Sequence, residues 1–439
     1  MRPPSEILDC DVAVIGGGPA GATVAALLSQ KGWRVAVFEK DRHPRFHIGE
    51  SLLPLNLELF EQLGIAQQIA SIGMVKRAAD FFSSDDGRTI SFSFADAFDR
   101  RYPTAYQVRR SAFDRILLDN ARDKGARVFE GTRVTHVEIG DNGVRLDVDG
   151  DATPPLVRAG YVVDATGRDT FLASRFGIKR RNPKHTSAAL YGHFRGALRS
   201  SGPDEGNISI YWFAHGWLWF IPLADGTTSI GAVCWPYYLK TRRTDPSEFF
   251  LQTIALCPAL QARLKDAELI APATATGNYS YTSARMAGDR YIMVGDAFAF
   301  IDPVFSSGVY LAMKSSFLAA EVVDGALKDP TAATRLNRGF ERTVRRGLRT
   351  FSWMIYRMTS PAMRELILKP KDVVGVKRAV ISLLAGDVYG RGAVWWRLMV
   401  FRTIYYMTSI SHLRRSIAAW RRRRIAIVPQ AIHATDGSG

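Results

Sequence analysis

The chain has 439 residues, 47% of them hydrophobic, which suits a globular protein of two or three domains with a sizeable core. Its three cysteines, Cys10, Cys234 and Cys257, are far apart and odd in number, which excludes a disulfide framework and favours a reducing compartment. The net charge of +16 indicates an acidic partner, which could be nucleic acid, a membrane or an acidic protein. The first residues, MRPPSEILDCD, lack the apolar segment of a secretory signal, so we expect a cytoplasmic protein.

The first predicted elements surround a glycine-rich turn. The segment DVAVIGGGPAGATVAALLSQKGWRVAVFEKD reads as a buried strand, a turn, a helix and a second strand that ends at Glu39. Gly16, Gly18 and Gly21 have the spacing that gives a tight turn, close approach of a pyrophosphate and close packing of helix on strand. Glu39 is placed to bind the ribose hydroxyls of an adenosine. The pattern predicts a dinucleotide site, and the alternative is a glycine turn without a ligand.

A short aromatic strand is predicted in the middle of the chain. In GWLWFIPLADG, Trp217, Trp219 and Ile221 should lie on one face and Leu218 and Phe220 on the other, because side chains alternate along a strand. Aromatic residues at this period are typical of sheets that bury large areas. From these residues alone, packing of a hydrophobic core is the favoured interpretation.

Other predicted elements flank this strand along the chain. Arg109 heads a helix in QVRRSAFDRILLDNA, and VVDATGRDTFLASRFG is a strand that runs into a loop. Farther on, GDRYIMVGDAFAFIDPVFSSGVYLAMKSS gives a strand, the pair Gly295 and Asp296, a turn at Pro303 and a helix after small residues. Asp296 could cap the strand end, and Arg109 could be a solvated arginine at a helix end.

The last part of the chain has a different composition. Residues 346–430 read as helices broken by Pro361, Pro370 and Gly390, with many arginines and no acidic residue between Trp395 and Arg424. Arg397 and Arg402 interrupt the apolar run, which argues against a membrane span. We expect an amphipathic helical lid with a basic rim, which could grip an acidic protein or make peripheral contact with an anionic membrane. The alternative is a solvated basic tail.

The order of these motifs resembles the flavoprotein monooxygenase superfamily over roughly residues 8–345. The resemblance implies FAD as the cofactor, with Gly16, Gly18, Gly21 and Glu39 at its adenosine and pyrophosphate end. It also implies that Asp296 binds the ribityl chain and that Arg109 contacts the flavin side.

Within that superfamily the chain resembles the flavin-dependent halogenases. The tunnel-wall motif Trp-x-Trp-x-Ile-Pro of this branch is matched by Trp217, Trp219, Ile221 and Pro222. The segment FHIGESLLP is also shared with this branch, although reductases of the geranylgeranyl type carry a similar one. In the halogenases the tryptophans form a wall that keeps the organic substrate away from the flavin.

The same resemblance implies further site residues. Lys76, in GMVKRAADFF, matches the lysine that receives hypohalous acid and presents it to an electron-rich ring. Ser307 and Gly308 stand where backbone N–H groups hold the halide, chloride or bromide. From the residues alone, Lys76 could be a solvated surface charge, and Ser307 and Gly308 could be small residues that make room for the flavin.

One departure from the family bears on the substrate. Halogenases of free tryptophan have a glutamate two residues before the Ser-Gly pair, and this chain has Phe305 there. The resemblance therefore implies the branch that halogenates pyrroles or phenols, often tethered to an acyl or peptidyl carrier protein. The basic charge suits such an acidic carrier, and no nucleic acid is expected.

Together these observations predict an α/β protein. A doubly wound FAD-binding core, residues 1–345, carries an inserted mixed or antiparallel sheet at about 77–104 and 185–285, and is followed by a helical region, 346–430, and a polar tail, 431–439. A single dinucleotide fingerprint predicts that a separate flavin reductase supplies reduced FAD. The rivals to a halogenase are an aromatic hydroxylase, a geranylgeranyl-reductase-like enzyme and a flavin-binding docking protein without catalysis.

Overall fold

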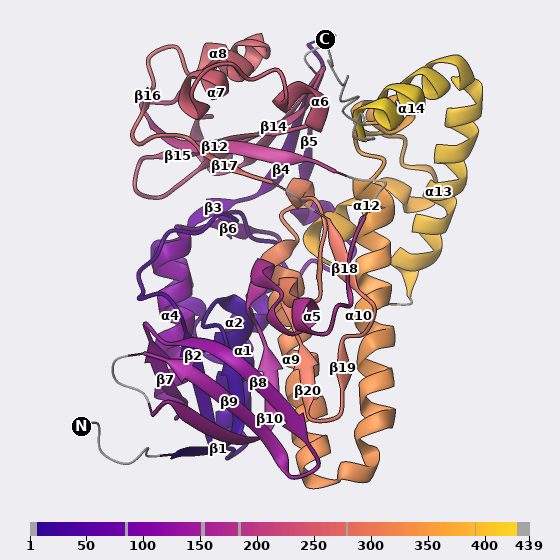
Figure 1. Cartoon of the computed structure of the whole chain (residues 1–439). Coiled ribbons are helices and arrows are strands. Elements are labelled where there is room, and N and C mark those ends of the chain that lie inside the picture. The colour runs from indigo at the N-terminus through magenta and orange to yellow at the C-terminus, as the bar shows by residue number, and fades with distance from the viewer. Residues whose placement is uncertain are drawn as a thin grey trace, which may run out of the picture.

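A computed structural model describes residues 7–83, 87–150, 154–182, 186–277, 280–390 and 392–427, and for Trp420 and residues 422–427 it describes the backbone alone. The polar tail predicted at 431–439 lies outside these residues. The predicted fold class is confirmed, because a doubly wound sheet, a second mixed sheet and a set of C-terminal helices are all present (Figure 1).

The first sheet contains the glycine turn. Its five parallel strands lie in the order β20-β10-β1-β2-β7, with a short antiparallel strand and a hairpin added to them. The parallel strands are β1 (Ile7–Ile15), β2 (Val35–Glu39), β7 (Arg127–Glu130), β10 (Leu156–Asp164) and β20 (Tyr291–Met293), and the added strands are β8 (Arg133–Gly140), β9 (Gly143–Asp149) and β19 (Ala287–Gly288). Strands β1, β2 and β10 are mostly buried Val, Ile, Ala and Phe, as parallel strands covered on both faces require.

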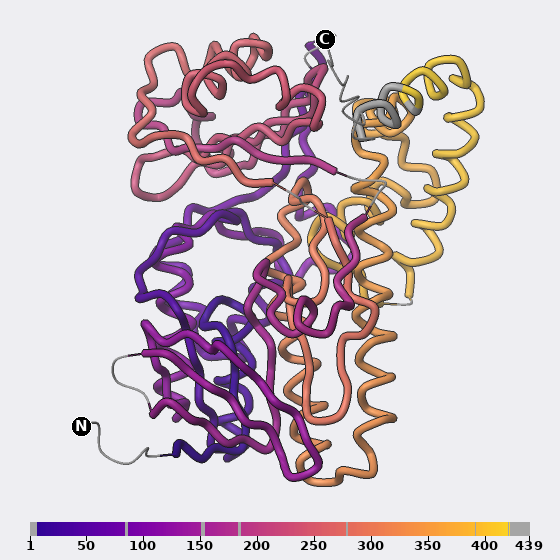
Figure 2. Tube along the Cα trace, in the orientation of Figure 1, coloured from indigo at the N-terminus to yellow at the C-terminus, as the bar shows by residue number. Residues whose placement is uncertain are grey.

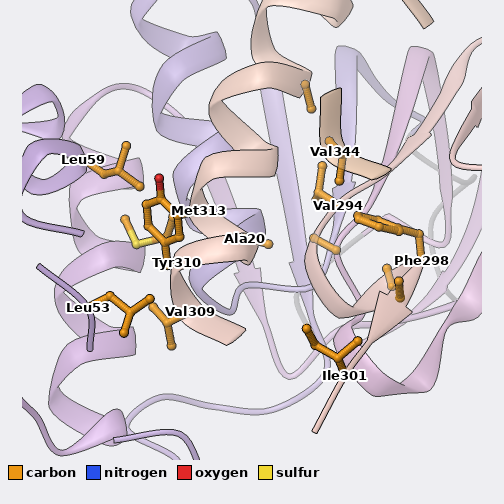
Figure 3. Packing of buried hydrophobic residues seen from close by; sticks show 14 of the residues in the cluster. Ala20, Leu53, Leu59, Val294, Phe298, Ile301, Val309, Tyr310, Met313 and Val344 are labelled. Atoms are coloured by element: carbon orange, nitrogen blue, oxygen red, sulfur yellow. The ribbon is translucent and has the colours of Figure 1, made fainter. Parts of the chain in front are cut away.

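Helices cover this sheet, and α1 packs against both α4 and α9. They are α1 (Pro19–Gln30), α2 (Asn56–Leu63), α3 (Ala66–Ile72), α4 (Arg110–Asp123), α5 (Phe171–Arg175) and α9 (Gly308–Lys328). Figure 3 shows Tyr310 and Met313 on the side of α9 that faces Leu53 and Leu59, while Ala20 of α1 lies on its other side. The first turn of α9 is thereby fixed between the sheet and the segment that precedes α2.

The second sheet contains the aromatic strand. Its order is β16-β12-β15-β14-β13-β4-β5, with β17 beside β12, and only the β13–β4 pair is parallel. The strands are β4 (Ala78–Ser83), β5 (Thr89–Ser93), β12 (Ala188–Arg195), β13 (Ile208–Phe213), β14 (Gly216–Pro222), β15 (Thr228–Cys234), β16 (Glu268–Leu269) and β17 (Thr274–Thr276). Figure 2 shows residues 78–83 of the early part of the chain running beside the later strands of this sheet. Helices α6 (Pro236–Leu239), α7 (Pro246–Ala255) and α8 (Pro258–Arg263) belong to the same part of the chain.

Short strands and 3-10 turns complete the fold, and one pair of them positions Lys76. Strand β3 (Met74–Lys76) pairs with β6 (Ala105–Gln107), which sets Lys76 opposite Ala105. The others are β11 (Lys179–Arg181), β18 (Tyr281–Ser283), β21 (Ala299–Phe300) and the 3-10 turns η1 (Phe94–Asp96), η2 (Gly167–Asp169), η3 (Gly202–Asp204), η4 (Gly295–Ala297), η5 (Pro303–Phe305), η6 (Pro330–Ala332) and η7 (Val373–Gly375).

The C-terminal part is helical, as predicted, but it begins earlier than residue 346. Helix α10 (Ala333–Ile355) runs through that boundary, because Phe340, Val344 and Phe351 continue one buried face along it. It is followed by α11 (Pro361–Leu368), α12 (Val376–Ala385), α13 (Ala393–Ser411) and α14 (Leu413–Ile427). Within the described residues, none of the helices combines the length and the hydropathy that crossing a bilayer needs.

Candidate functional site

A cavity opens between the glycine turn of the first sheet and one face of the second. Gly16 and Gly18 line it from the turn, Glu39 from the end of β2, Asp296 from η4, and Trp219 from β14. The first turn of α9 completes the lining at Gly308. Parts of the chain that are far apart in sequence therefore contribute to one cavity.

The glycine turn is shaped by contacts that exclude side chains. Gly16 has φ +101°, and a Cβ there would lie 2.5 Å from the carbonyl oxygen of Ala165. A Cβ on Gly21 would lie 1.8 Å from the oxygen of Gly16, so the helix and the turn are in direct backbone contact. Above Gly18, by contrast, the nearest neighbour of a Cβ would be Arg45 Nη2, 3.5 Å away. The space over Gly18 is open to the cavity, next to the N–H groups that the start of α1 leaves without helical partners.

Glu39 is a buried carboxylate held in a fixed orientation at the end of β2. Its Oε2 accepts a hydrogen bond from the Gly17 N–H at 2.6 Å, and its Oε1 accepts one from the Asp41 N–H at 2.9 Å. Each carboxylate oxygen has two lone pairs, so both can accept a further donor from the cavity. This is the chemistry that a pair of sugar hydroxyls would need.

Asp296 lines the cavity from the turn before β21. Burial raises the pKa of its carboxyl to about 7, and the positive charges of Arg168 and Arg110 oppose that rise. Its neighbour Gly295 has φ +58° and donates its N–H to Ser315 Oγ at 2.9 Å. The turn is thereby tied to α9, and the Asp296 side chain faces the cavity.

The two tryptophans of β14 both line the cavity. Trp217 and Trp219 are each 5% exposed, and their ring centroids are 5.9 Å apart. Together with Ile221 they belong to the larger hydrophobic core, whereas Leu218 and Phe220 belong to the core on the other side of the sheet. The alternation predicted from the sequence is confirmed. Pro222 is the last residue of β14, after Ile221.

The Trp219 indole is positioned by strand β15. Its Nε1 donates a hydrogen bond to Ser229 Oγ at 3.2 Å. The ring lies directly over Gly231, where a Cβ would be only 2.1 Å from Trp219 Cζ2. Only glycine at position 231 leaves room for the indole in this orientation.

Lys76 is a buried lysine, so the interpretation as a surface charge is wrong. It is 2% exposed, and its Nζ donates to Ser51 Oγ at 3.0 Å and to the Leu52 carbonyl at 2.9 Å. The Nζ lies 5.2 Å from the centre of the Phe94 ring. Burial lowers the pKa of Lys76 to about 7. Ser51 lines the cavity, and its hydroxyl therefore stands between the cavity and the lysine.

Ser307 and Gly308 begin the long helix α9. Ser307 is buried at the N-cap position, and Gly308 lines the cavity. A Cβ on Gly308 would meet no atom within 4 Å, which means that the space beside this first turn is open. Helix starts carry N–H groups without helical partners and favour negative charge, so a small anion suits this position.

The Arg109 guanidinium lies 3.9 Å from Oε1 of Glu50, a residue that lines the cavity, and the next residue of the chain lines the cavity itself. The Arg109 guanidinium pairs with Asp225 at 2.6 Å and donates to Thr227 Oγ1 at 2.6 Å. Arg110, the first residue of α4, is buried, forms two hydrogen bonds with Asp114 and donates to the Ile48 carbonyl at 2.6 Å. The sequence could have indicated that Arg110 faces inward, because Arg110 and Asp114 are four residues apart and so lie on the same face of the helix.

Glu50 and Ser51 line the cavity and were not singled out from the sequence, although both lie in the segment GESLLP. Glu50 Oε1 is 2.8 Å from His193 Nε2 in a buried pair, and Glu50 Oε2 has no hydrogen-bond partner among the described residues. Ser51 is the residue that joins Lys76 to the cavity. Neither role could be read from spacing, because both depend on how the segment folds back over β3.

Comparison with known proteins finds one family model, one similar relative and two similar solved structures that bear on this site. A family model described as an FAD binding domain matches residues 9–338. The chlorinase of 1H-pyrrole-2-carbonyl-peptidyl-carrier protein from Pseudomonas fluorescens is 30% identical over 409 residues, which cover 87% of this chain and 90% of that protein. Among solved structures, the flavin-dependent brominase Bmp2 is 26% identical with a TM-score of 0.77, covering 93% of this chain and 99% of that one. A flavoprotein/dehydrogenase from Cytophaga hutchinsonii is 26% identical with a TM-score of 0.83, covering 92% of this chain and 100% of that one.

Proposed function

The chain belongs to the flavin-dependent halogenases of the FAD-binding-domain family, and from this premise we propose that its substrate is an electron-rich ring, a pyrrole or a phenol, carried by an acidic carrier protein. Three observations support this substrate class. The relative from Pseudomonas fluorescens is named for a pyrrole on a peptidyl carrier protein. Phe305 stands where halogenases of free tryptophan have a glutamate, and the net charge of +16 suits an acidic partner.

FAD is the cofactor, and the residues around the cavity fit it. The open space over Gly18 and the start of α1 would take the pyrophosphate, Glu39 the adenosine ribose, and Asp296 the ribityl chain. When bound in its reduced form, FAD supplies the electrons with which dioxygen and a halide are converted into hypohalous acid. The single dinucleotide fingerprint of this chain supports a separate flavin reductase as the source of reduced FAD.

The observation that carries the proposal for the site is the burial of Lys76, whose Nζ contacts Ser51 Oγ and the Leu52 carbonyl beside the cavity. A lysine with a pKa of about 7 is largely neutral at pH 8, and a neutral amine has the lone pair that hypohalous acid requires. In the proposed step, the Nζ lone pair bonds to the halogen, and the proton released from nitrogen leaves with hydroxide as water. The ring then takes the halogen from nitrogen, and the ring proton returns to the amine.

Trp217 and Trp219 have a second role in this proposal. Two indoles that fill one side of the cavity leave no room for an aromatic substrate at that position, whereas a chloride or bromide ion is small enough to reach the first turn of α9. Ser307 and Gly308 would hold that ion through backbone N–H groups. The ring would then approach Lys76 from its other side.

The test separates formation of the oxidant from its transfer. Reduced FAD, dioxygen and chloride are supplied to the wild type, to Lys76→Ala and to Lys265→Ala. The last variant is the control, because Lys265 is an exposed lysine just after α8. Hypohalous acid is measured with a small halogen acceptor, and ring halogenation with a pyrrole-2-carbonyl thioester. We expect Lys76→Ala to release hypohalous acid at the wild-type rate and to lose ring halogenation by at least 100-fold. Ring halogenation near the wild-type rate in Lys76→Ala would remove this lysine from the mechanism.

A further inference from the structure

Four arginines line a groove between helices α10 and α13, outside the cavity described above. Arg342, Arg346 and Arg349 come from α10 and Arg402 from α13, while Trp395 and Leu398 provide an apolar wall. The spacing of the three arginines on α10 places them on one face, over about 10 Å of helix. Figure 1 shows α10 and α13 side by side, with α13 at the outer edge of the molecule.

These arginines lack negative partners within the described residues. Their groove has no acidic side chain in its lining, and none of the four forms an ion pair with a carboxylate there. The buried Nε of Arg346 has no hydrogen-bond partner, and burial lowers the pKa of Arg402. The nearby Glu341 pairs instead with Arg345. In a concave surface, four arginines without carboxylate partners in the described part of the chain favour the binding of an anionic ligand.

A second hollow continues the groove toward the site. It shares Thr350, Trp395 and Leu398 with the groove. Phe98 and Val388 also line it, and its charged lining residues are Asp99, Arg101 and Asp387. Phe98 follows Phe94, the ring beside Lys76 Nζ, by four residues. The chain beside Val388 continues into Tyr389, whose ring centroid is 6.3 Å from that of Tyr310 on α9. Residues that line this hollow are therefore close along the chain to the aromatic neighbours of Lys76 and of the first turn of α9.

We propose that the α10–α13 groove is the docking surface for an acidic helix of the carrier protein, so that the adjoining hollow receives the arm that bears the substrate. The inference rests on the proposed function and adds the location of the partner. Carboxylates repeated at helical spacing along the partner would face Arg342, Arg346 and Arg349, and an apolar side chain would pack on Trp395. The groove is concave, which suits a helix better than a flat bilayer.

Charge reversal at exposed positions tests the docking surface. Arg342→Glu/Arg349→Glu changes two exposed arginines of the groove, and Arg195→Glu/Lys265→Glu makes the same change of net charge at the edge of the second sheet. The probe is a peptidyl-carrier protein loaded with pyrrole-2-carbonyl, and its Kd is measured by fluorescence anisotropy. We expect Kd to rise at least tenfold in the groove variant and less than twofold in the control. Arg342→Lys/Arg349→Lys should retain most of the affinity, because the charge remains.

Turnover distinguishes a failure of docking from a failure of the proposed function. With the small thioester of pyrrole-2-carboxylate, which needs no docking, the groove variant should halogenate at the wild-type rate. Carrier binding without any halogenated product from either substrate would contradict the proposed function and leave the docking surface supported. Unchanged carrier affinity in the groove variant would overturn the inference, as would absence of binding by the wild type. Loss of sedimentation with phosphatidylserine vesicles, at unchanged carrier affinity, would assign the groove to a membrane and also overturn it.

Discussion

Replacing Lys76 by methionine should make the protein more stable at neutral pH, although the lysine is proposed to act in the reaction. The side chain is 2% exposed, and a fall of its pKa from 10.5 to about 7 corresponds to about 5 kcal/mol against the charged form in the folded state. Methionine has a similar length and no charge. It leaves the Leu52 carbonyl without a donor, which costs about 1–3 kcal/mol. The net expectation below pH 7 is a gain of roughly 2–4 kcal/mol in the free energy of unfolding.

The sign of the pH dependence follows from proton binding. Between pH 7 and 10.5 the folded protein has a neutral Lys76 while the unfolded chain keeps the proton, so stability of the wild type rises with pH in this window. Relative to Lys76→Met, the wild type should gain about 4 kcal/mol between pH 6 and pH 10. Urea unfolding of both proteins at the two pH values measures this difference, with Lys265→Met as the exposed-lysine control. A difference that stays constant within 1 kcal/mol would show that Lys76 does not titrate there and would refute the neutral-amine argument.

Three further predictions concern the residues around the cavity. Gly231→Ala would place a methyl group 2.1 Å from Trp219 Cζ2, so the indole must move; we expect a loss of about 1–3 kcal/mol in urea unfolding and a shifted tryptophan emission, and an unchanged spectrum would contradict the packing. Trp219→Phe should remain folded but yield more hydrogen peroxide and less halogenated product per reduced FAD; unchanged partitioning would make the indole purely structural. Gly18→Val should abolish FAD binding in equilibrium titration while the melting temperature of the apoprotein stays within a few degrees, and normal affinity would mean that the phosphate lies elsewhere.

Local patterns were sufficient to predict several features that the structure contains. The glycine turn depends on backbone contacts between neighbouring segments, and the spacing of Gly16, Gly18 and Gly21 encodes them directly. The faces of β14 follow from the alternation of side chains along a strand. The start of α9 at Gly308 follows from the proline turn and the small residues before it. In each case a short stretch of sequence carries the pattern, even where the turn it encodes packs against a distant residue, as Gly16 packs against Ala165.

Features that depend on distant contacts could not be predicted in this way. The pKa of Lys76 is lowered because Ser51, Leu52 and Phe94 bury its side chain. Nothing in GMVKRAADFF indicates that burial. The choice between Arg109 and Arg110 depended on one residue of helix register, and the ion pair of Arg109 is with Asp225, which is 116 residues away. The basic groove requires α10 and α13 to pack together, and the predicted boundary at residue 346 had divided α10.

The two interpretations of the aromatic strand, core packing and tunnel wall, do not exclude each other. Trp217 and Trp219 belong to the larger hydrophobic core and also line the cavity, because that core extends from the first sheet to the inner face of β14. Leu218 and Phe220 supply the core on the opposite face, so β14 would remain buried even if its tryptophans were exchanged for smaller aromatic residues. The stability of the strand is thus shared between two faces, while only one face meets the cavity. The residues of the cavity face can therefore change with the reaction while the opposite face keeps the strand in place. Truncation of a tryptophan to alanine removes both the packing and the cavity lining, so it cannot separate the two roles. Trp219→Phe can, because it keeps an aromatic ring in the core.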